Sequence, residues 1–306
     1  MIFKLWKRTR DALPPPAMER KTLGTFEVTR EIGRGAMGVV YLGKDIRSGV
    51  EVALKTMALA KEFNAAALQD AKERFMREAE ILTWLAHPDI VTIYDVGEEQ
   101  GLAYIAMEYL KGKELTEFIR PDRLLPVPKV LDIIARAADA LGYAHEEGHE
   151  KGIVHRDVKP GNIMYDADLD SVKVTDFGIS RLIDLNATRM GLVLGTPLYM
   201  SPEQVMGQQI TGVSDLFSLG STLYELLCGQ SPFVANSALE VMRRIVQEPH
   251  TGLAAVRPDI PECVCAVVNR ALEKSRSTGS RAATKWRQPS ASAGCKPNSA
   301  ARPDGT

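Results

Sequence analysis

The sequence predicts an α+β protein with two lobes: a small antiparallel β-sheet with one main helix, then a mostly helical lobe. Residues 26–109 carry short segments in which apolar and polar residues alternate, as they do in half-buried strands. Residues 130–273 instead carry apolar residues at helical spacing. The length of 306 residues is enough for two lobes that share a cleft.

The composition narrows the range of partners. The formal net charge is −1, so we expect no nucleic-acid partner. No apolar run reaches the roughly 18 residues that a transmembrane helix needs. The four cysteines lack the spacing of a zinc site, and so few are typical of a protein made in a reducing cytosol. We therefore expect a cytoplasmic protein.

The first 24 residues are interpreted as a linker of juxtamembrane type. Met1–Arg8 mixes cations with large apolar side chains, and Pro14–Pro16 is typical of a linker. A frayed amphipathic terminus is the favoured interpretation of residues 1–8. The alternative is peripheral association with a membrane, as part of a longer membrane-bound parent.

Three glycines follow the first predicted strand, residues 26–32. Gly33, Gly35 and Gly38 form a G-x-G-x-x-G pattern, and glycine lets the backbone approach phosphate oxygens without an obstructing Cβ. A dinucleotide-binding fold would need a helix after this pattern. A strand follows here, so we predict a flap between two strands.

Lys55 ends the next predicted strand, residues 52–55. A lysine on an apolar strand costs desolvation energy unless it is paired. The candidate partner is Glu78, within a predicted helix over residues 71–82; Glu80 is the alternative and is expected to be an exposed charge. Two further strands complete the predicted sheet, at residues 90–96 and 103–109. The helices predicted for the second lobe cover residues 130–145, 214–228, 238–246 and 264–273.

A polar loop lies between apolar flanks at residues 153–163. It places Asp157, Lys159 and Asn162 within six residues, more polar groups than core packing requires. A short apolar strand, residues 172–174, then leads into Asp176-Phe177-Gly178. We interpret these two segments as the chemical centre of the chain.

These motifs occur in a specific order, which ends at Ser201-Pro202-Glu203. Together they resemble a eukaryotic-type serine/threonine protein kinase of the kind found in bacteria, over residues 26–274. The resemblance implies a two-lobed kinase domain over residues 25–274, with its N-lobe at 25–109 and its C-lobe at 110–274. It also implies transfer of the γ-phosphoryl group of ATP to serine or threonine hydroxyls of protein substrates in signal transduction. Lys159 argues for these hydroxyls over tyrosine.

The resemblance assigns a role to each catalytic side chain. Asp157 would act as the base toward the substrate hydroxyl, and Lys159 would neutralise charge on the phosphoryl group. Lys55, oriented by Glu78, would hold the α- and β-phosphates. Asn162 and Asp176 would ligate Mg²⁺, with Mn²⁺ as an alternative. The residues implied at the ATP site are Ile32, Gly33, Arg34, Gly35, Ala36, Met37, Gly38, Val40, Ala53, Lys55, Met107, Glu108, Leu110 and Met164.

Regulation is implied by Arg156, a cation directly before the catalytic aspartate. In family members with this arginine, a phosphorylated activation loop supplies the anion. Thr188 is the candidate phosphosite, and we expect its autophosphorylation, with transient dimerisation, to raise activity. Thr196 is assigned a structural contact with the catalytic aspartate and lysine.

The resemblance ends after Lys274. Residues 275–306 lack apolar periodicity, so we predict a disordered tail and a missing last helix. With one permitted choice of codons, an alternative reading frame through residues 277–294 would encode a segment very like the arginine and helix that the family carries here, so we interpret the tail as a candidate frame-shifted segment. Glu203 would then lose its buried arginine partner, which predicts a weakened C-terminal lobe.

Two other functions are weighed against the active kinase. The first is a pseudokinase, an ATP-binding scaffold that the altered tail has made inactive. The second is a small-molecule phosphotransferase on the same fold. Lys159 and the segment 195–203 disfavour the second, because both serve peptide substrates in the family.

Overall fold

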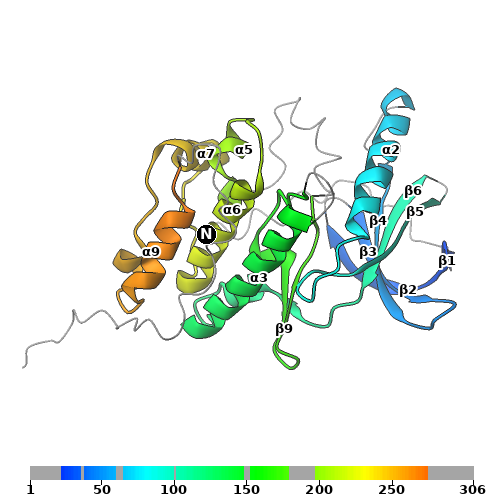
Figure 1. Cartoon of the computed structure of the whole chain (residues 1–306), viewed down its shortest axis with the longest axis horizontal. Helices are drawn as coiled ribbons and strands as arrows, with labels where there is room; N and C mark the ends of the chain where they lie inside the picture. The colour runs from blue at the N-terminus through cyan, green and yellow to red at the C-terminus, as the bar shows by residue number, and fades with distance from the viewer. Residues whose placement is uncertain are drawn as a thin grey trace, which may run out of the picture. The chain divides into compact units, whose positions relative to one another are not determined.

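The computed structural model describes residues 22–35, 38–59, 65–99, 101–147, 152–178 and 197–274. The chain divides into two compact units (Figure 1). The first contains residues up to Met76 and Ile93–Tyr109, and the second contains Arg77–Thr92 and everything from Leu110 onward. An α+β fold with a β-sheet unit and a mostly helical unit was predicted, and it is confirmed.

The first unit is built on a six-stranded antiparallel sheet. Its strands lie in the order β1-β2-β3-β4-β6-β5. Their bounds are β1 Thr22–Leu23, β2 Phe26–Gly35, β3 Gly38–Asp45, β4 Glu51–Met57, β5 Ile93–Glu99 and β6 Leu102–Glu108. Each connection within β2–β4 and β5–β6 is a hairpin between sequence neighbours, which explains why a short-range alternating pattern was enough to predict them.

The register of this sheet sorts its side chains between two faces. One face carries a hydrophobic cluster that includes Tyr41 of β3, Leu54 of β4 and Ala106 of β6, which lie opposite one another. Because the side-chain period of a strand is two residues, Val40 and Lys55 share the other face, and the two are direct register partners. Lys55 therefore projects from the face opposite the cluster.

The main helix, α2, spans Ala65–Leu82 and so begins before the predicted range. Its buried positions recur at helical spacing, with Phe75 1%, Ala79 0% and Leu82 5% exposed. Glu80 is exposed, as expected for the alternative acid, whereas Glu78 is half-buried.

The strand predicted at residues 90–96 is wrong at its start, because β5 begins only at Ile93. Ile90 instead forms an isolated parallel bridge with Val174. The backbone N–H of Val91 donates to the Val174 carbonyl at 3.0 Å, and that of Val174 donates to the Asp89 carbonyl at 2.8 Å. The apolar run that begins at Ile90 therefore pairs first with Val174 and then, from Ile93, with β6. Only tertiary contacts distinguish these two pairings.

The second unit is organised around α6, Gly212–Cys228, in which every residue from Ser214 to Leu227 is buried. It contacts α3, Val127–Glu147, and α9, Glu262–Ala271, as Figure 1 shows. Helix α6 ends at Gly229, whose φ of 77° is a left-handed cap that favours glycine. The other elements are β7 Lys113–Glu114, β8 Ile163–Asp166, β9 Ser171–Val174, α5 Pro202–Val205, α7 Ala238–Gln247 and α8 Leu253–Val256, with 3₁₀ turns at Leu115–Phe118, Pro160–Asn162 and Pro197–Tyr199.

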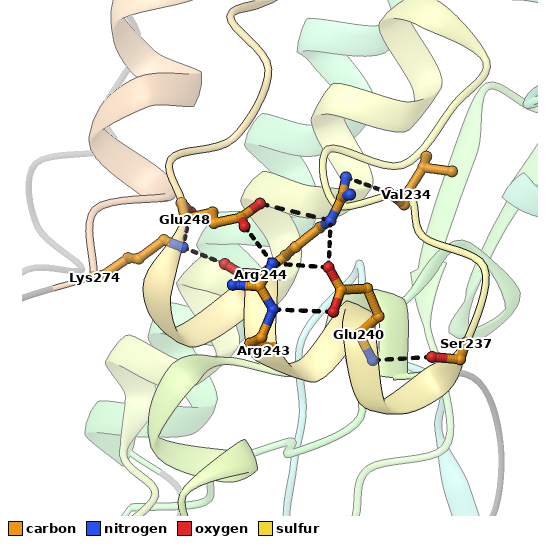
Figure 2. Close-up of polar contacts among 7 residues, drawn as sticks. All are labelled: Val234, Ser237, Glu240, Arg243, Arg244, Glu248 and Lys274. Carbon is orange, nitrogen blue, oxygen red and sulfur yellow. Dashed lines mark hydrogen bonds and ion pairs between the residues drawn. The ribbon is translucent and has the colours of Figure 1, made fainter.

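Lys274, the last described residue, closes the C-terminal end of α7 (Figure 2). Its Nζ donates to the carbonyl of Arg244 at 2.5 Å and to that of Glu248, and it lies 5.0 Å from the centre of the Phe233 ring. The Arg244 carbonyl also accepts from the backbone N–H of Glu248 at 3.0 Å, so Lys274 is a second donor to this carbonyl and a donor to the Glu248 carbonyl just beyond α7. None of the described helices is long and apolar enough to cross a membrane.

Candidate active site

Asp157 receives two hydrogen bonds on one carboxylate oxygen. Lys159 Nζ donates to Asp157 Oδ2 at 2.7 Å, and Asn162 Nδ2 donates to the same oxygen at 3.0 Å. Asn162 Nδ2 also donates to the Asp157 backbone carbonyl at 2.7 Å. Among the described residues no hydrogen bond reaches Oδ1, so that oxygen can accept a proton from a bound hydroxyl.

His155 ties this loop to the strand that precedes Asp176. Its side chain is 0% exposed, and its Nδ1 accepts from the backbone N–H of Asp157 at 3.3 Å. Nε2 must therefore carry the proton, which it donates to the Thr175 carbonyl at 2.9 Å. The imidazole also contacts the Phe177 ring at a centroid distance of 4.5 Å. A neutral histidine thus holds the two polar segments together.

Asp176 is positioned by the residue before it. Thr175 donates to the Asn162 carbonyl through its backbone N–H at 2.9 Å and through its hydroxyl at 3.2 Å. Asp176 itself adopts a φ of 59°, which is uncommon for a residue with a side chain and costs free energy that the surroundings must repay. The two oxygen-bearing residues predicted to hold a metal are therefore tied to neighbouring backbone.

Asp215 holds the loop from the side of α6. Its carboxylate is 1% exposed, and it accepts from the backbone N–H groups of His155 and Arg156, each at 2.7 Å. Nε2 of His145, on α3, lies 2.8 Å from Asp215 Oδ2. An aspartate of α6 thus caps the backbone of the loop. The contribution of His145 was missed, since no local pattern connects residues 70 positions apart.

In the first unit, Val40, Ala53, Lys55 and Met107 lie on one face of the sheet. Val40 is the register partner of Lys55, and Ala53 is the partner of Met107. This face presents three apolar side chains beside a cation, which suits a flat apolar ring attached to phosphates. Lys55 and Glu78 belong to different units, so their pairing stays a prediction.

The β2–β3 hairpin carries the predicted phosphate loop. A Cβ at Gly38, where φ is 150°, would lie 1.9 Å from the Thr56 carbonyl oxygen, so this position excludes any side chain. A Cβ at Gly35 would meet nothing within 4 Å. Arg34 forms a two-pronged ion pair with Glu31, at 2.9 and 2.5 Å, which holds its guanidinium close to β2.

These observations test whether the described residues fit ATP and a divalent metal. Contacts with the other described residues do not require a glycine at position 35, whereas the close approach of a phosphate would. No hydrogen bond from the described residues reaches Asn162 Oδ1, because the side-chain bonds of Asn162 are made by Nδ2. An amide oxygen and the Asp176 carboxylate are hard ligands, typical of a metal that also binds phosphates. The described residues contain no cluster of three or more His, Cys, Asp or Glu that could hold a metal by itself.

The remaining predicted site residues fall in three groups. Ile32 lies in β2, and Glu108 ends β6. Leu110 and Met164 lie in the second unit, where both are half-buried. Ala36, Met37, Thr188 and Thr196 lie outside the described residues.

Glu203 has a hydrogen-bond partner among the described residues. Ser214 Oγ, in the first turn of α6, donates to Glu203 Oε1 at 2.5 Å. The same serine accepts from the backbone N–H of Thr211 at 3.2 Å. The loss of an arginine partner at Glu203 stays a prediction. The predicted disorder and altered frame of residues 275–306 lie outside the described residues.

Comparisons with known proteins agree on one family. The family profile described as "Protein kinase domain" matches residues 26–282. Serine/threonine-protein kinase PrkC of Bacillus subtilis is 38% identical over 256 residues, which are 83% of this chain and 38% of PrkC. Serine/threonine-protein kinase PknB of Mycobacterium leprae is 37% identical over 282 residues, which are 90% of this chain and 43% of PknB. The chain thus spans about two fifths of the length of these curated relatives.

Among solved structures, the kinase domain of Mycobacterium tuberculosis PknI is similar to this chain with a TM-score of 0.64 and 31% identity. The match covers 83% of this chain and 90% of the PknI chain.

Proposed function

The chain belongs to the protein kinase domain family, and from this membership we propose that it is a serine/threonine protein kinase. It would transfer the γ-phosphoryl group of ATP to serine or threonine hydroxyls of protein substrates. The observation that carries the proposal is the environment of Asp157, where Lys159 and Asn162 occupy one carboxylate oxygen and leave the other to a substrate. Residues 25–274 are proposed as the catalytic domain.

The proposed reaction assigns the proton to Asp157. The substrate hydroxyl oxygen forms a bond to the γ-phosphorus, and the bond from that phosphorus to the β,γ-bridging oxygen breaks. The hydroxyl proton passes to Asp157 Oδ1, which the hydrogen bonds on Oδ2 orient. Phosphoryl transfer relies on positioning and charge neutralisation more than on covalent chemistry, which is why a fixed carboxylate suffices.

Two lysines are proposed to neutralise phosphate charge. Lys159 lies 2.7 Å from Asp157 Oδ2, so it would meet the transferred group where the substrate oxygen attacks. Lys55 would hold the α- and β-phosphates, oriented by Glu78. Both assignments follow from the family resemblance.

Mg²⁺ is the metal proposed, with Mn²⁺ as an alternative, and Asn162 Oδ1 and the Asp176 carboxylate would hold it. When bound, it would supply positive charge to the phosphate oxygens. These residues contribute hard oxygen atoms tied to the loop by Thr175, whose backbone and hydroxyl both bind the Asn162 carbonyl.

The adenine-binding residues are proposed from the family resemblance. Val40, Ala53 and Met107, which share one face of the sheet in the first unit, would contact the adenine ring, as would Met164 of β8. The backbone at Glu108 and Leu110 would bond the base. The loop at residues 32–38 would cover the phosphates.

Regulation by phosphorylation is proposed through Arg156. Its side chain is exposed, and none of the described residues forms an ion pair with it. A phosphorylated Thr188 would supply the anion, and an encounter between two copies of the chain would allow the transfer. Thr196 would contact Asp157 and Lys159.

One assay separates the active kinase from the pseudokinase and the small-molecule phosphotransferase. The purified protein would be incubated with Mg²⁺, labelled ATP and a generic basic protein, beside Asp157→Asn and the matched control Asp139→Asn, which changes an exposed residue of α3. We expect Asp157→Asn to lower the rate by a factor of about 10² to 10⁴ and Asp139→Asn to leave it unchanged. ATP binding without transfer would favour the pseudokinase, and label on small molecules alone would favour the third function.

A further inference from the structure

Arg156 is held in a backbone conformation that it does not favour. Its φ is 67°, in the left-handed region that residues with side chains rarely adopt. Such a conformation persists only where neighbouring groups enforce it. Asp157 follows directly, so the groups that enforce this conformation also set the direction of the catalytic carboxylate.

Two side chains hold the peptide groups on either side of Arg156. Asp215 accepts from the N–H of Arg156 at 2.7 Å. Gln204, in α5, donates from Nε2 to the carbonyl of Arg156 at 2.8 Å. That carbonyl belongs to the peptide that joins Arg156 to Asp157, and the N–H of the same peptide binds His155 Nδ1. The peptide plane before Asp157 is therefore fixed at both of its polar atoms.

Gln204 is itself fixed by the start of α5. Its Oε1 accepts from the backbone N–H of Ser201 at 2.9 Å, and its own backbone N–H donates to Ser201 Oγ at 3.4 Å. This is a reciprocal capping box, which pins a short helix at its N-terminus. The side-chain amide of Gln204 thus accepts one hydrogen bond with Oε1 and donates another with Nε2, and no carboxylate can do both.

We propose that Gln204 is a positioning residue for the catalytic aspartate. Its side chain links the start of α5 to the Arg156 carbonyl, and this carbonyl belongs to the peptide group that precedes Asp157. Helix α5 is also bonded to α6 through Glu203 and Ser214, and α6 carries Asp215, the other residue that holds Arg156. The inference rests on the proposed kinase function, because its consequence is a change in the rate of phosphoryl transfer.

The substitution Gln204→Glu separates the two bonds of this side chain. Glutamate keeps an acceptor for the Ser201 N–H and forms the favoured capping box, but it loses the donor to the Arg156 carbonyl. We expect kcat to fall about tenfold, KM for ATP to stay within about twofold, and Tm to stay within ~2 °C. Gln208→Glu makes the same chemical change on an exposed side chain four positions later, and it is expected to change none of the three.

Hydrogen exchange gives a second readout that does not depend on turnover. We expect Gln204→Glu to speed exchange in the peptide covering residues 152–160 and to leave residues 212–228 of α6 unchanged. An inactive wild type would contradict the proposed function, and the inference with it. Two results would overturn the inference while leaving the proposed function intact, provided that the wild type is active. The first is a Gln204→Glu variant with the same kcat and the same local exchange as the wild type. The second is a Gln204→Glu variant with a lower Tm and faster exchange throughout the second unit.

Discussion

Asp215→Asn is the substitution with the largest expected effect on the second unit. The carboxylate is 1% exposed. It accepts hydrogen bonds from the backbone N–H groups of His155 and Arg156, and its Oδ2 lies 2.8 Å from Nε2 of His145. Asparagine keeps one oxygen and presents an NH₂ group to at least one of the backbone N–H groups. The shape of the side chain is unchanged, so the change isolates the hydrogen bonds.

The magnitude follows from these bonds. A hydrogen bond to a charged group is worth about 1.5–3 kcal/mol, and a buried donor left unsatisfied costs about 1–3 kcal/mol. We therefore expect the free energy of unfolding to fall by about 3–5 kcal/mol, a large share of the roughly 5–15 kcal/mol of a typical protein. For a domain of this size the Tm should fall by about 10 °C.

Thermal unfolding followed by circular dichroism measures this change, with Asp139→Asn as the exposed control. Phosphoryl transfer measured well below the lowered Tm should also fall, because Arg156 loses one of its two restraints. A Tm of the Asp215→Asn variant within about 2 °C of wild type would show that the aspartate does not hold the loop.

Three further predictions test separate parts of the structure. Gly38→Ala places a Cβ against a backbone carbonyl and should destabilise the first unit by about 1–3 kcal/mol. Gly35→Ala should leave Tm unchanged and weaken ATP binding, which calorimetry measures. Ser214→Ala removes the hydroxyl that donates to Glu203 of α5 and should lower the free energy of unfolding by about 1–3 kcal/mol in a denaturant titration. Its control, Ser221→Ala, removes a buried hydroxyl that has no hydrogen-bond partner among the described residues and should lower the free energy of unfolding by less than half of that. Burial raises the pKa of Glu225 above its ordinary 4.5, so the folded state binds more protons than the unfolded state, and the stability contributed by this residue falls as the pH rises above 4.5. Glu225→Gln should lose less Tm than wild type when the pH is raised from below 4.5 to neutrality.

Local patterns were enough for much of the fold. The strands β2, β3, β4 and β6 were predicted because each pairs with a nearby segment and alternates between two faces. The end of α6 was predicted at Gly229, which adopts the left-handed conformation that glycine favours. The start of β5 was not predictable, because Ile90 is as apolar as the strand that follows but pairs with Val174.

The site divides in the same way. The polar residues at 157, 159 and 162 were identified from six consecutive positions, since they lie on one loop that brings them together. The groups that hold this loop come from α3, α5 and α6, and their contacts join residues 48 to 70 positions apart. Gln204 had a local signal in the Ser-x-x-Gln capping box, but that signal predicts only the helix start.

By itself the sequence determined which chemical groups the protein carries and the order in which they occur, because side-chain identity and short-range spacing are written along the chain. Tertiary structure alone decided how Asp157 is aimed. A left-handed Arg156 is unfavourable on its own, and it persists because Asp215 and Gln204, brought from two other helices, bind the peptide groups on either side of it.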